Sequence, residues 1–437
     1  MNQSNHDVAP GTLLDLMIER PAVGGRMIAR HAGRIILVLG AIPGERVRAR
    51  VERSRRDMSL ASVEEVIAAD KDRRPTSGET SCGGNVFAHI AYPRQLSLKR
   101  EIVADAFARI GRLSLPEGMA IAPSPERGYR LRARLYVAGT RLGFLHRGSH
   151  RPCDAAGTGQ LTAETGEVLD RLQRVLALQA AGIGIRAVDL AESIAGDQRA
   201  AHLWLDRGRP ASAETLSSLG AVRGITGVSA SVRRADPPRH VSGDPVVAEP
   251  WSTMLPSWPR LPESALCRRP AAFFQGNRFL LASLIERVLA ELTAGPVVDL
   301  YAGVGVFALA AAASGADDVT AVEDDPISAD DLAANARAAG GRVRVVRRTV
   351  ERYLRASQRA SSGIWIVDPP RTGLSRDARG RIASAGPPRL VYVSCDVATL
   401  ARDLRALGDA GYTLRRLDGF DLFPNTAHIE LVATLER

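Results

Sequence analysis

The chain has 437 residues and a formal net charge of +10, and arginine greatly outnumbers lysine among its basic residues. This balance favours an anionic polymer such as nucleic acid as a partner, although an arginine-rich composition also follows from a GC-rich genome. The length accommodates two or three domains, and no apolar run approaches the ~20 residues of a membrane span, so we expect no membrane association.

The first seven residues have neither a basic start nor an apolar core, so we expect no signal peptide. Four widely spaced cysteines do not make a disulfide framework, which fits a reducing cytoplasm. We therefore expect a cytoplasmic protein.

Short strand-like runs separated by turn residues fill residues 11–70, after a tail over residues 1–10 that we expect to fray. The run Arg46–Val51 alternates strictly, so one face of this strand is apolar and the other carries a row of arginines. Five short strands in about sixty residues predict an OB-like β-barrel, a shape that often binds nucleic acid. A small β-module with a solvated basic face would give the same pattern.

The next part of the chain mixes helical and strand patterns. Residues 96–113 and 161–180 have the spacing of amphipathic helices. The run 129–137 alternates again, with arginines at 130, 132 and 134, and the basic run 142–150 follows it. These two runs predict a hairpin that presents positive charge. The Pro-, Arg- and Ser-rich loop over residues 233–262 gives no clear element.

From about residue 261 strand and helix patterns alternate, which predicts a doubly wound, largely parallel sheet. The predicted strands cover residues 297–301, 318–323, 343–348, 363–368, 390–394, 412–417 and 428–435.

A glycine turn follows the first strand of this sheet. Gly303 and Gly305 let the backbone approach a ligand closely, and Glu323 ends the next strand, where a carboxylate can accept hydrogen bonds from ribose hydroxyls. Residues 303–308 also satisfy the dinucleotide fingerprint G-x-G-x-x-A, so the motif alone fits both NAD and S-adenosylmethionine. Asp299, ahead of the glycines, favours the second.

Two further strands end on residues suited to chemistry. Asp368 begins an Asp-Pro-Pro-Arg turn, the kind of turn in which base-modifying methyltransferases hold the target base, although a tight connection has the same pattern. Cys395 lies between a strand and a helix, where the helix N-terminus favours a thiolate, whereas a buried cysteine can also be a small hydrophobe.

Two weaker signals flank these motifs. Gln275 follows two aromatic residues and could hold a ligand, but Asn277 beside it is as readily an ordinary helix cap. In the last predicted strand His428 and Glu430 share a face, where Glu430 could act as a base if burial tunes its pKa. A solvated edge is the simpler interpretation of that pair.

In this order the motifs resemble the uracil-C5 RNA methyltransferases, the enzymes that make 5-methyluridine in ribosomal and transfer RNA. The matching pieces are Phe-Phe-Gln-x-Asn at 273–277, Asp-Leu-Tyr-x-Gly-x-Gly at 299–305, Asp-Pro-Pro-Arg at 368–371, Ser-Cys-Asp at 394–396 and Phe-Pro-x-Thr-x-His-x-Glu at 423–430.

The resemblance covers the whole chain and implies a multidomain α/β protein. It implies a TRAM module in the N-terminal OB-like β-barrel over residues 1–70 and an α+β RNA-binding domain over residues 71–260. Helix 96–113 of that domain is expected to pack on the catalytic domain. The resemblance further implies a Rossmann-like S-adenosylmethionine methyltransferase domain over residues 261–437.

The resemblance also implies a mechanism. Uracil C5 is a poor nucleophile, and a thiolate that adds to C6 makes it reactive. Cys395 would be that nucleophile, and Glu430 matches the base that removes the C5 proton. The remaining matches surround the methyl donor and the base pocket: Gln275, Tyr301, Glu323 and Asp368. The target uridine must leave any stack to reach such a pocket.

The sequence departs from the family at an iron–sulfur site that many ribosomal members carry, with the pattern Cys-x5-Cys-Gly-x-Cys and a later cysteine. Cys82 keeps one ligand position, and Cys153 lies five residues before the fourth. The other three positions hold Thr76, Asn85 and Thr158. Because one or two thiolates cannot hold such a cluster, we expect no iron–sulfur cluster and no other metal.

Three rival interpretations remain open. They are methylation of another base atom such as cytosine C5, a non-catalytic RNA-binding factor on a methyltransferase scaffold, and an NAD-dependent oxidoreductase. The terminal His-x-Glu and the intact Cys395 favour a uracil enzyme. Ribosomal RNA is favoured over transfer RNA because the barrel and middle domain follow the ribosomal layout, and a monomer is the default expectation. Val306, where members often have Asn, is expected to weaken cofactor affinity.

Overall fold

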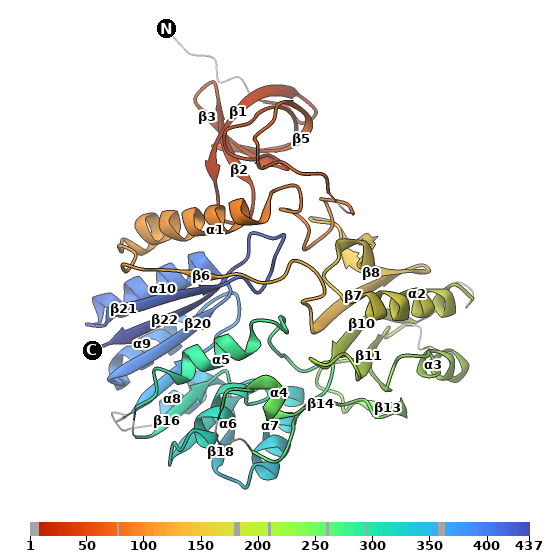
Figure 1. Cartoon of the computed structure of the whole chain (residues 1–437), viewed down its shortest axis with the longest axis vertical. Helices are drawn as coiled ribbons and strands as arrows, with labels where there is room; N and C mark the ends of the chain where they lie inside the picture. The colour runs from red at the N-terminus through yellow and green to blue at the C-terminus, as the bar shows by residue number, and fades with distance from the viewer. Residues whose placement is uncertain are drawn as a thin grey trace.

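The computed structural model describes three packed parts of the chain, a barrel, a middle sheet and a larger catalytic sheet (Figure 1). It describes residues 8–76, 78–178, 184–208, 211–258, 262–293, 295–356 and 363–437. Within these residues no helix is both long enough and apolar enough to cross a membrane.

Five strands close the predicted N-terminal barrel in the order β1-β2-β3-β5-β4. Their bounds are β1 Leu13–Pro21, β2 Met27–His31, β3 Arg34–Leu39, β4 Arg46–Ser54 and β5 Met58–Ala68. The alternation in β4 places Val47, Ala49 and Val51 in the barrel core and leaves the arginines outside. The predicted barrel is therefore confirmed.

The chain then crosses onto the catalytic sheet before it enters the middle sheet. Helix α1 (Tyr92–Ala106) begins earlier than predicted, because Pro93 in the first turn lacks an amide that the helix does not need there. A π-helical turn, η1 (Phe107–Gly111), continues it, and both pack in one apolar cluster with α10 (Val397–Asp409). Strand β6 (Ile121–Ala122) then pairs with the edge strand of the catalytic sheet.

The middle sheet has seven strands in the order β13-β12-β11-β10-β7-β8-β9. Their bounds are β7 Arg132–Ala138, β8 Arg141–Leu145, β9 Pro152–Cys153, β10 Ile185–Glu192, β11 Arg199–Leu205, β12 Gly227–Ser231 and β13 Arg239–Gly243. The predicted basic hairpin is β7–β8. Its helices are α2 Ala163–Leu178 and α3 Ala213–Gly220; the end of the helix predicted over 161–180 lies outside the described residues.

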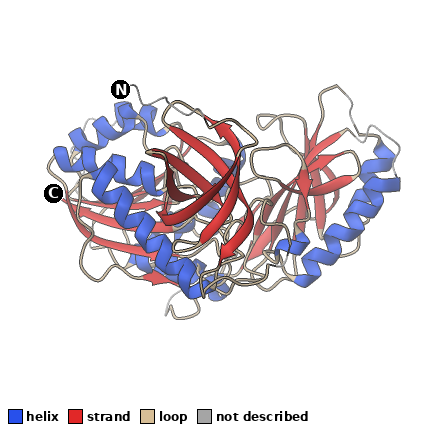
Figure 2. Cartoon of the chain, turned by 90° about the horizontal axis from the view of Figure 1, so that it is seen from above, coloured by secondary structure: helices blue, strands red, loops and turns tan. Residues whose placement is uncertain are grey.

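The two faces of the middle sheet differ in polarity. Leu135, Leu190 and Leu203 point to one face and pack with the apolar sides of α2 and α3. These helices lie on the outer side of the sheet (Figure 2). The opposite face carries polar and aromatic groups, among them Arg134 and Trp204, and is turned toward the catalytic sheet.

The catalytic sheet has eight strands in the order β18-β17-β16-β19-β20-β22-β21-β6. Besides β6 they are β16 Val297–Leu300, β17 Val319–Glu323, β18 Val343–Arg347, β19 Ile364–Val367, β20 Arg389–Ser394, β21 Thr413–Phe420 and β22 Glu430–Glu436. Five neighbouring strands, β18 to β20, are parallel and β22 runs against β20, so the predicted doubly wound, largely parallel sheet is confirmed.

Helices cover both faces of this sheet, which explains why β16 and β19 are buried along their whole length. They are α5 Leu281–Leu289, α6 Val306–Ala313, α7 Pro326–Ala338, α8 Val350–Ala356, α9 Arg376–Ala385 and α10. A short helix, α4 (Trp251–Met254), and a two-stranded sheet of β14 (Val247–Glu249) and β15 (Leu266–Arg268) connect the two larger parts. The strand order changes direction between β16 and β19, and a ligand crevice is expected at their carboxyl ends.

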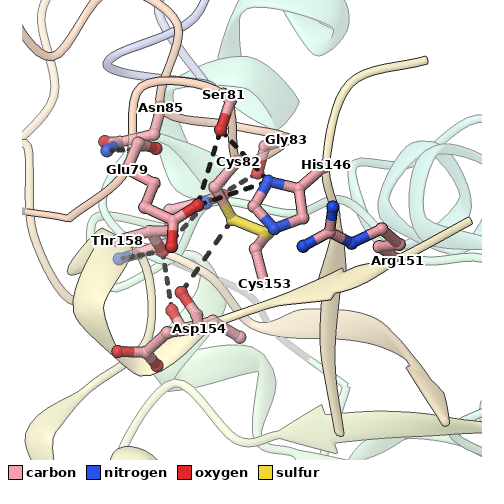
Figure 3. The surroundings of a disulfide bond; sticks show 12 residues. Glu79, Ser81, Cys82, Gly83, Asn85, His146, Arg151, Cys153, Asp154 and Thr158 are labelled. Carbon is pink, nitrogen blue, oxygen red and sulfur yellow. Dashed lines mark hydrogen bonds and ion pairs between the residues drawn. A yellow bond between two sulfur atoms is a disulfide. The ribbon is translucent and has the colours of Figure 1, made fainter. Parts of the chain in front are cut away.

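A disulfide joins Cys82, in the segment after the barrel, to Cys153 in β9 (Figure 3). The wide spacing of the four cysteines predicted no disulfide framework, but folding brings together two of them that are 71 positions apart. Cys267 and Cys395 are free.

The residues at the former iron–sulfur positions do not fit a cluster. The Cys82 and Cys153 sulfurs are bonded to each other, and the Thr158 hydroxyl donates to the carbonyl of Ala155 at 2.7 Å. Within the described ranges no group of three or more His, Cys, Asp or Glu side chains could hold a metal ion. The absence of an iron–sulfur cluster stays a prediction.

Candidate active site

A cavity of about 630 Å³ opens at the carboxyl ends of the parallel strands, between the catalytic sheet and the middle sheet. All six site residues predicted from the sequence line it: Gln275, Tyr301, Glu323, Asp368, Cys395 and Glu430. The first and last of them are more than 150 residues apart in the sequence. They come together because ligands of open α/β sheets bind at the carboxyl ends of the strands.

One lobe of the cavity is built on the glycine turn after β16. Tyr301, Gly303 and Gly305 all have left-handed backbone conformations, with φ of 65°, 57° and 97°. A Cβ at Gly303 would meet nothing closer than Phe273 at 3.9 Å, so open space lies beside the turn. At Gly305 a Cβ would come within 2.6 Å of Leu332, which explains the glycine at that position.

Glu323 ties this turn to the start of α7. One carboxylate oxygen accepts from the amide of Gly303 at 2.8 Å, and the other accepts from the amides of Asp324 and Asp325 at 3.0 and 2.7 Å. A carboxylate has about four acceptor positions, so one remains for a ligand hydroxyl. Burial raises the pKa of Glu323.

Asp299 lies beneath the turn and is fully buried, outside the cavity lining. It accepts from the amide of Ala308 at 3.0 Å, which fixes the start of α6. Burial, together with the neighbouring Asp368, raises its pKa well above its usual value. Asp299 therefore shapes the glycine turn and does not touch a ligand directly.

Gln275 donates to the carboxylate of Asp368 at 3.2 Å across the middle of the cavity. Burial and the nearby Glu323 raise the pKa of Asp368 to about 7. Behind this pair, the guanidinium of Arg268 lies over the ring of Phe274 at 4.0 Å and is held by a buried ion pair with Glu249. The segment that carries Gln275 is thus anchored from the side away from the cavity.

Asn277 has the ordinary role that the sequence left open for it. Its side-chain oxygen accepts from the amides of Phe279 and Leu280 before α5, and its amide group donates to Ser124 and Leu422. Asn277 is a buried cap, whereas Gln275, two residues earlier, points into the cavity.

Cys395 and Glu430 both line the cavity, and the carboxyl group of Glu430 acts electrostatically on the Cys395 thiol. Ser394 pairs with Leu431 between the antiparallel strands β20 and β22, so Cys395 follows the last pair on one strand and Glu430 precedes it on the other. Glu430 is buried, so a solvated edge is excluded for it. β22 begins at Glu430, which leaves His428 in the preceding loop and not in the strand as predicted.

The expectation that Cys395 ionises readily is wrong for this structure. Burial and the carboxyl groups of Glu430 and Asp368 raise the pKa of the thiol to about 12. Asp396 caps α10 by accepting from the amide of Thr399 at 2.9 Å, so the helix N-terminus is already occupied by an anion. Arg371 donates to the thiol and lowers its pKa, but by less than the other effects raise it.

Burial also favours the neutral form of Glu430. Burial and the charge of Asp368 raise its pKa well above the usual value for a glutamate, and Arg371 opposes that shift. Arg371 is therefore the positive group that both Cys395 and Glu430 share.

Helix α1 holds the loop that leads into Glu430. Lys99 and Asp421 form a fully buried ion pair, and Lys99 also donates to the carbonyl of Phe423 at 3.0 Å. One turn earlier, the side chain of Gln95 donates to the Asn425 side chain and accepts from its amide, both at 2.9 Å. Phe423 lines the cavity, so α1 sets one of its walls.

Four arginines that the prediction of site residues left out also line the cavity: Arg130, Arg132, Arg234 and Arg371. Arg132 lies over the ring of Phe273 at 6.0 Å, and its buried Nε has no partner among the described residues. Burial and the neighbouring arginines lower its pKa to about 10. The alternation in the hairpin already signalled Arg130 and Arg132, but no local pattern identified Arg234.

The sequence of the chain is similar to a known protein family and to individual proteins over most of their length. Residues 268–437 match the family described as tRNA (Uracil-5-)-methyltransferase. A 23S rRNA (uracil(1939)-C(5))-methyltransferase RlmD from Halomonas elongata is 32% identical, over 97% of this chain and 89% of that protein. The protein of the same name from Pseudomonas entomophila is 32% identical, over 96% and 93%.

One solved structure matches nearly the whole fold. It is the tRNA (uracil-54, C5)-methyltransferase of Pyrococcus abyssi in complex with S-adenosyl-L-homocysteine. The TM-score is 0.73 with 21% sequence identity, and the match covers 96% of this chain and 99% of that one. At this identity the likeness establishes the fold, with its Rossmann-like catalytic part.

Proposed function

Since the chain belongs to the family of uracil-C5 RNA methyltransferases, we propose that it transfers the methyl group of S-adenosylmethionine to C5 of a specific uridine in ribosomal RNA. The observation that carries this proposal is that Cys395, just after β20, and Glu430, at the start of β22, line the same cavity as the Glu323 glycine turn. Ribosomal RNA is chosen because the relatives named for 23S rRNA match over nearly the full length of both chains.

The glycine-turn lobe fits S-adenosylmethionine. Glu323 keeps one acceptor position for a ribose hydroxyl, and Gly303 leaves open space beside Phe273. Phe273 is 51% exposed, so its ring is available to a flat heterocycle. Tyr301 and Asp368 border the same lobe. When bound there, the cofactor supplies an electrophilic methyl group on a sulfonium.

In the same cavity, Cys395 is placed to add to C6 of the flipped uracil, which makes C5 nucleophilic. After C5 has taken the methyl group, Glu430 accepts the C5 proton, the C6–S bond breaks and the thiolate leaves. Both groups must be ionised for these steps although burial favours their neutral forms. Arg371 is the residue that favours both anions, so we assign it a role in positioning charge.

The wider organisation follows the same proposal. We assign residues 1–70 as a TRAM module, 71–260 as the RNA-binding domain and 261–437 as the catalytic domain; the boundary at 260/261 lies outside the described residues. We further propose a cytoplasmic monomer without an iron–sulfur cluster. Iron and sulfide at less than one equivalent per purified chain would agree with this, and stoichiometric amounts would overturn it.

Tritium release tests the chemistry. Ribosomal RNA labelled with tritium at pyrimidine C5, from cells that lack this gene, is mixed with purified protein and S-adenosylmethionine. We expect release to water with the wild type and none with Cys395→Ala, while Cys395→Ala still binds the cofactor. Methyl transfer without release would mean that another atom is modified.

A second variant tests the assignment of the base. Glu430→Gln cannot accept the C5 proton, so we expect a covalent RNA–protein adduct that survives denaturation. The double variant Cys395→Ala/Glu430→Gln is the matched control and should form none. Normal turnover by Glu430→Gln would exclude Glu430 as the base.

A further inference from the structure

A second groove, of about 490 Å³, lies next to the active-site cavity on the middle sheet. Four arginines line it: Arg186, Arg207, Arg233 and Arg234. Asp206 is the acidic residue in its lining, and its side chain accepts from the amide of Gly208 at 3.1 Å. Arg234 lines both the groove and the active-site cavity, so the two adjoin at this residue.

The charge of this groove is only partly compensated. Arg233 pairs with Asp236, and Arg234 pairs with Asp325 at the start of α7. In the part of the chain that the structure describes, neither Arg186 nor Arg207 forms a salt bridge, although Arg207 is near enough to Asp236 to lower its pKa after the larger effect of Arg233. Four arginines in one concave site, two of them without a salt bridge, favour an anionic ligand.

Arg186 is held in a fixed position. Its guanidinium lies over the ring of Trp204 at 5.4 Å and donates to the carbonyl of Val232 at 3.1 Å. Trp204 is itself fixed by a hydrogen bond from its indole to Asp189 at 2.8 Å. A side chain that is already ordered loses little entropy when it binds a ligand, so Arg186 is preorganised to bind a phosphate.

We propose that this groove binds the phosphates of single-stranded RNA that flank the target uridine. This proposal rests on the proposed function, because it takes the active-site cavity as the place of the flipped base. A strand that leaves the cavity along the middle sheet meets Arg234 first and then Arg186, Arg207 and Arg233. The contacts are to the backbone, so the groove adds affinity and sets the direction of the strand without selecting a base.

Binding measured against salt concentration tests the groove. The full chain is titrated with a labelled single-stranded RNA of about 20 nucleotides, long enough to pass both sites. We compare the wild type with Arg207→Gln and Arg186→Gln/Arg207→Gln. The matched control is Arg174→Gln, an exposed arginine on α2, on the other face of the sheet.

Each lost phosphate contact should reduce the slope of log K against log salt by about 0.7. We therefore expect the double variant to bind about tenfold more weakly at low salt, with a slope smaller by about 1.4. Arg174→Gln should match the wild type, and S-adenosylmethionine should bind all variants equally. On an RNA of about three nucleotides, too short to leave the cavity, the variants and wild type should be equal.

An unchanged slope in the double variant would overturn the groove as an RNA site. An equal loss in Arg174→Gln would overturn it too, since that would indicate a general charge effect. A loss confined to binding of an acidic protein would mean that the groove serves a protein partner, which also contradicts the proposal. Because binding is read without methyl transfer, a wild type that releases no tritium but shows the predicted slopes would reject the proposed function and retain the groove.

Discussion

The barrel and the middle sheet each carry a row of alternating arginines, and the two rows have different surroundings. In the barrel, Arg48 lies between Asp15 at 2.9 Å and Glu65 at 2.7 Å, and Arg50 pairs with Glu64. The carboxylates come from the strands on either side, so the positive charges of Arg48 and Arg50 are compensated where they are exposed.

In the middle sheet, one arginine of the row, Arg134, forms a salt bridge with a carboxylate on a neighbouring strand among the described residues. Arg134 pairs with Asp189, whereas Arg130 and Arg132 line the active-site cavity. Identical spacing in the sequence therefore leads to a neutral surface in one case and to a basic wall in the other. The residues on the neighbouring strands, and not the row itself, decide whether such a pattern can bind RNA.

The largest expected effect is on stability, where the buried ion pair of Lys99 with Asp421 should matter far more than the exposed ion pairs of the barrel. Lys99→Met leaves Asp421 buried without a partner, and we expect a loss of about 3–5 kcal/mol in the free energy of unfolding. Urea denaturation would measure it. The double variant Lys99→Met/Asp421→Leu should recover most of the loss, since no charge is then stranded. A loss below 1 kcal/mol for the single variant would contradict a dry ion pair.

The two rows should differ next in their effect on activity. Arg132→Gln removes from the cavity wall a positive charge that forms no salt bridge among the described residues, and we expect kcat/KM for RNA to fall about 100-fold, or about 2.7 kcal/mol. Steady-state methylation at several RNA concentrations measures this. Arg48→Gln in the barrel is the matched control and should change kcat/KM less than threefold. Equal losses in the two variants would remove the distinction between the rows.

The barrel and the active-site cavity should also differ in how their carboxyl groups respond to pH. Arg50 lowers the pKa of the barrel carboxyl Glu64, whereas burial raises the pKa of Asp368 to about 7. Above the usual aspartate value and below pH 7, folded Asp368 keeps a proton that the unfolded chain has lost, so stability falls as pH rises. Asp368→Asn removes this loss.

Between pH 4 and pH 8, we expect the free energy of unfolding of Asp368→Asn to rise by about 2 kcal/mol relative to that of the wild type. This change is smaller than the full pKa shift would give, because Asp368 is partly accessible to solvent. Thermal unfolding at both pH values checks it, with Glu64→Gln as the control that should show no such gain. A constant difference between variant and wild type across this range would contradict a raised pKa.

The smallest effect belongs to the barrel row itself. Arg48→Gln/Arg50→Gln removes exposed ion pairs, which contribute little to stability, and should leave the salt dependence of RNA binding unchanged. Denaturation and the salt titration described for the groove measure both. A smaller salt slope in this variant would show that the barrel row binds phosphate despite its carboxylates.

Much of the fold could be predicted from the sequence because its signals are local. Alternation in Arg46–Val51 indicated a barrel strand, and the apolar runs of β16, β19 and β20 indicated a buried parallel sheet. The strand ends then placed Glu323 and Asp368 at one edge. Cys395 and Glu430 came from the resemblance, since their own sequence context also allowed structural roles.

The remaining features depend on contacts between distant parts of the chain. Arg234 lies in a loop without a regular pattern, and only the packing of the middle sheet against the catalytic sheet brings it to both cavities. Burial raises the pKa of Cys395, and Glu430 and Asp368 raise it further, and all three effects arise only in the folded chain. The disulfide between Cys82 and Cys153 likewise needs the segment after the barrel, which carries Cys82, to pack against β9.

The packing of α1, η1 and β6 on the catalytic sheet has a consequence for where the chain can be divided. A gene fragment that began near residue 261 would encode most of the catalytic sheet without β6 and without the helix that covers α10. Its product would expose the apolar surface against which Val103 and Phe107 pack. A catalytic unit with its apolar surface covered therefore needs the segment that precedes the middle sheet as well as residues 261–437.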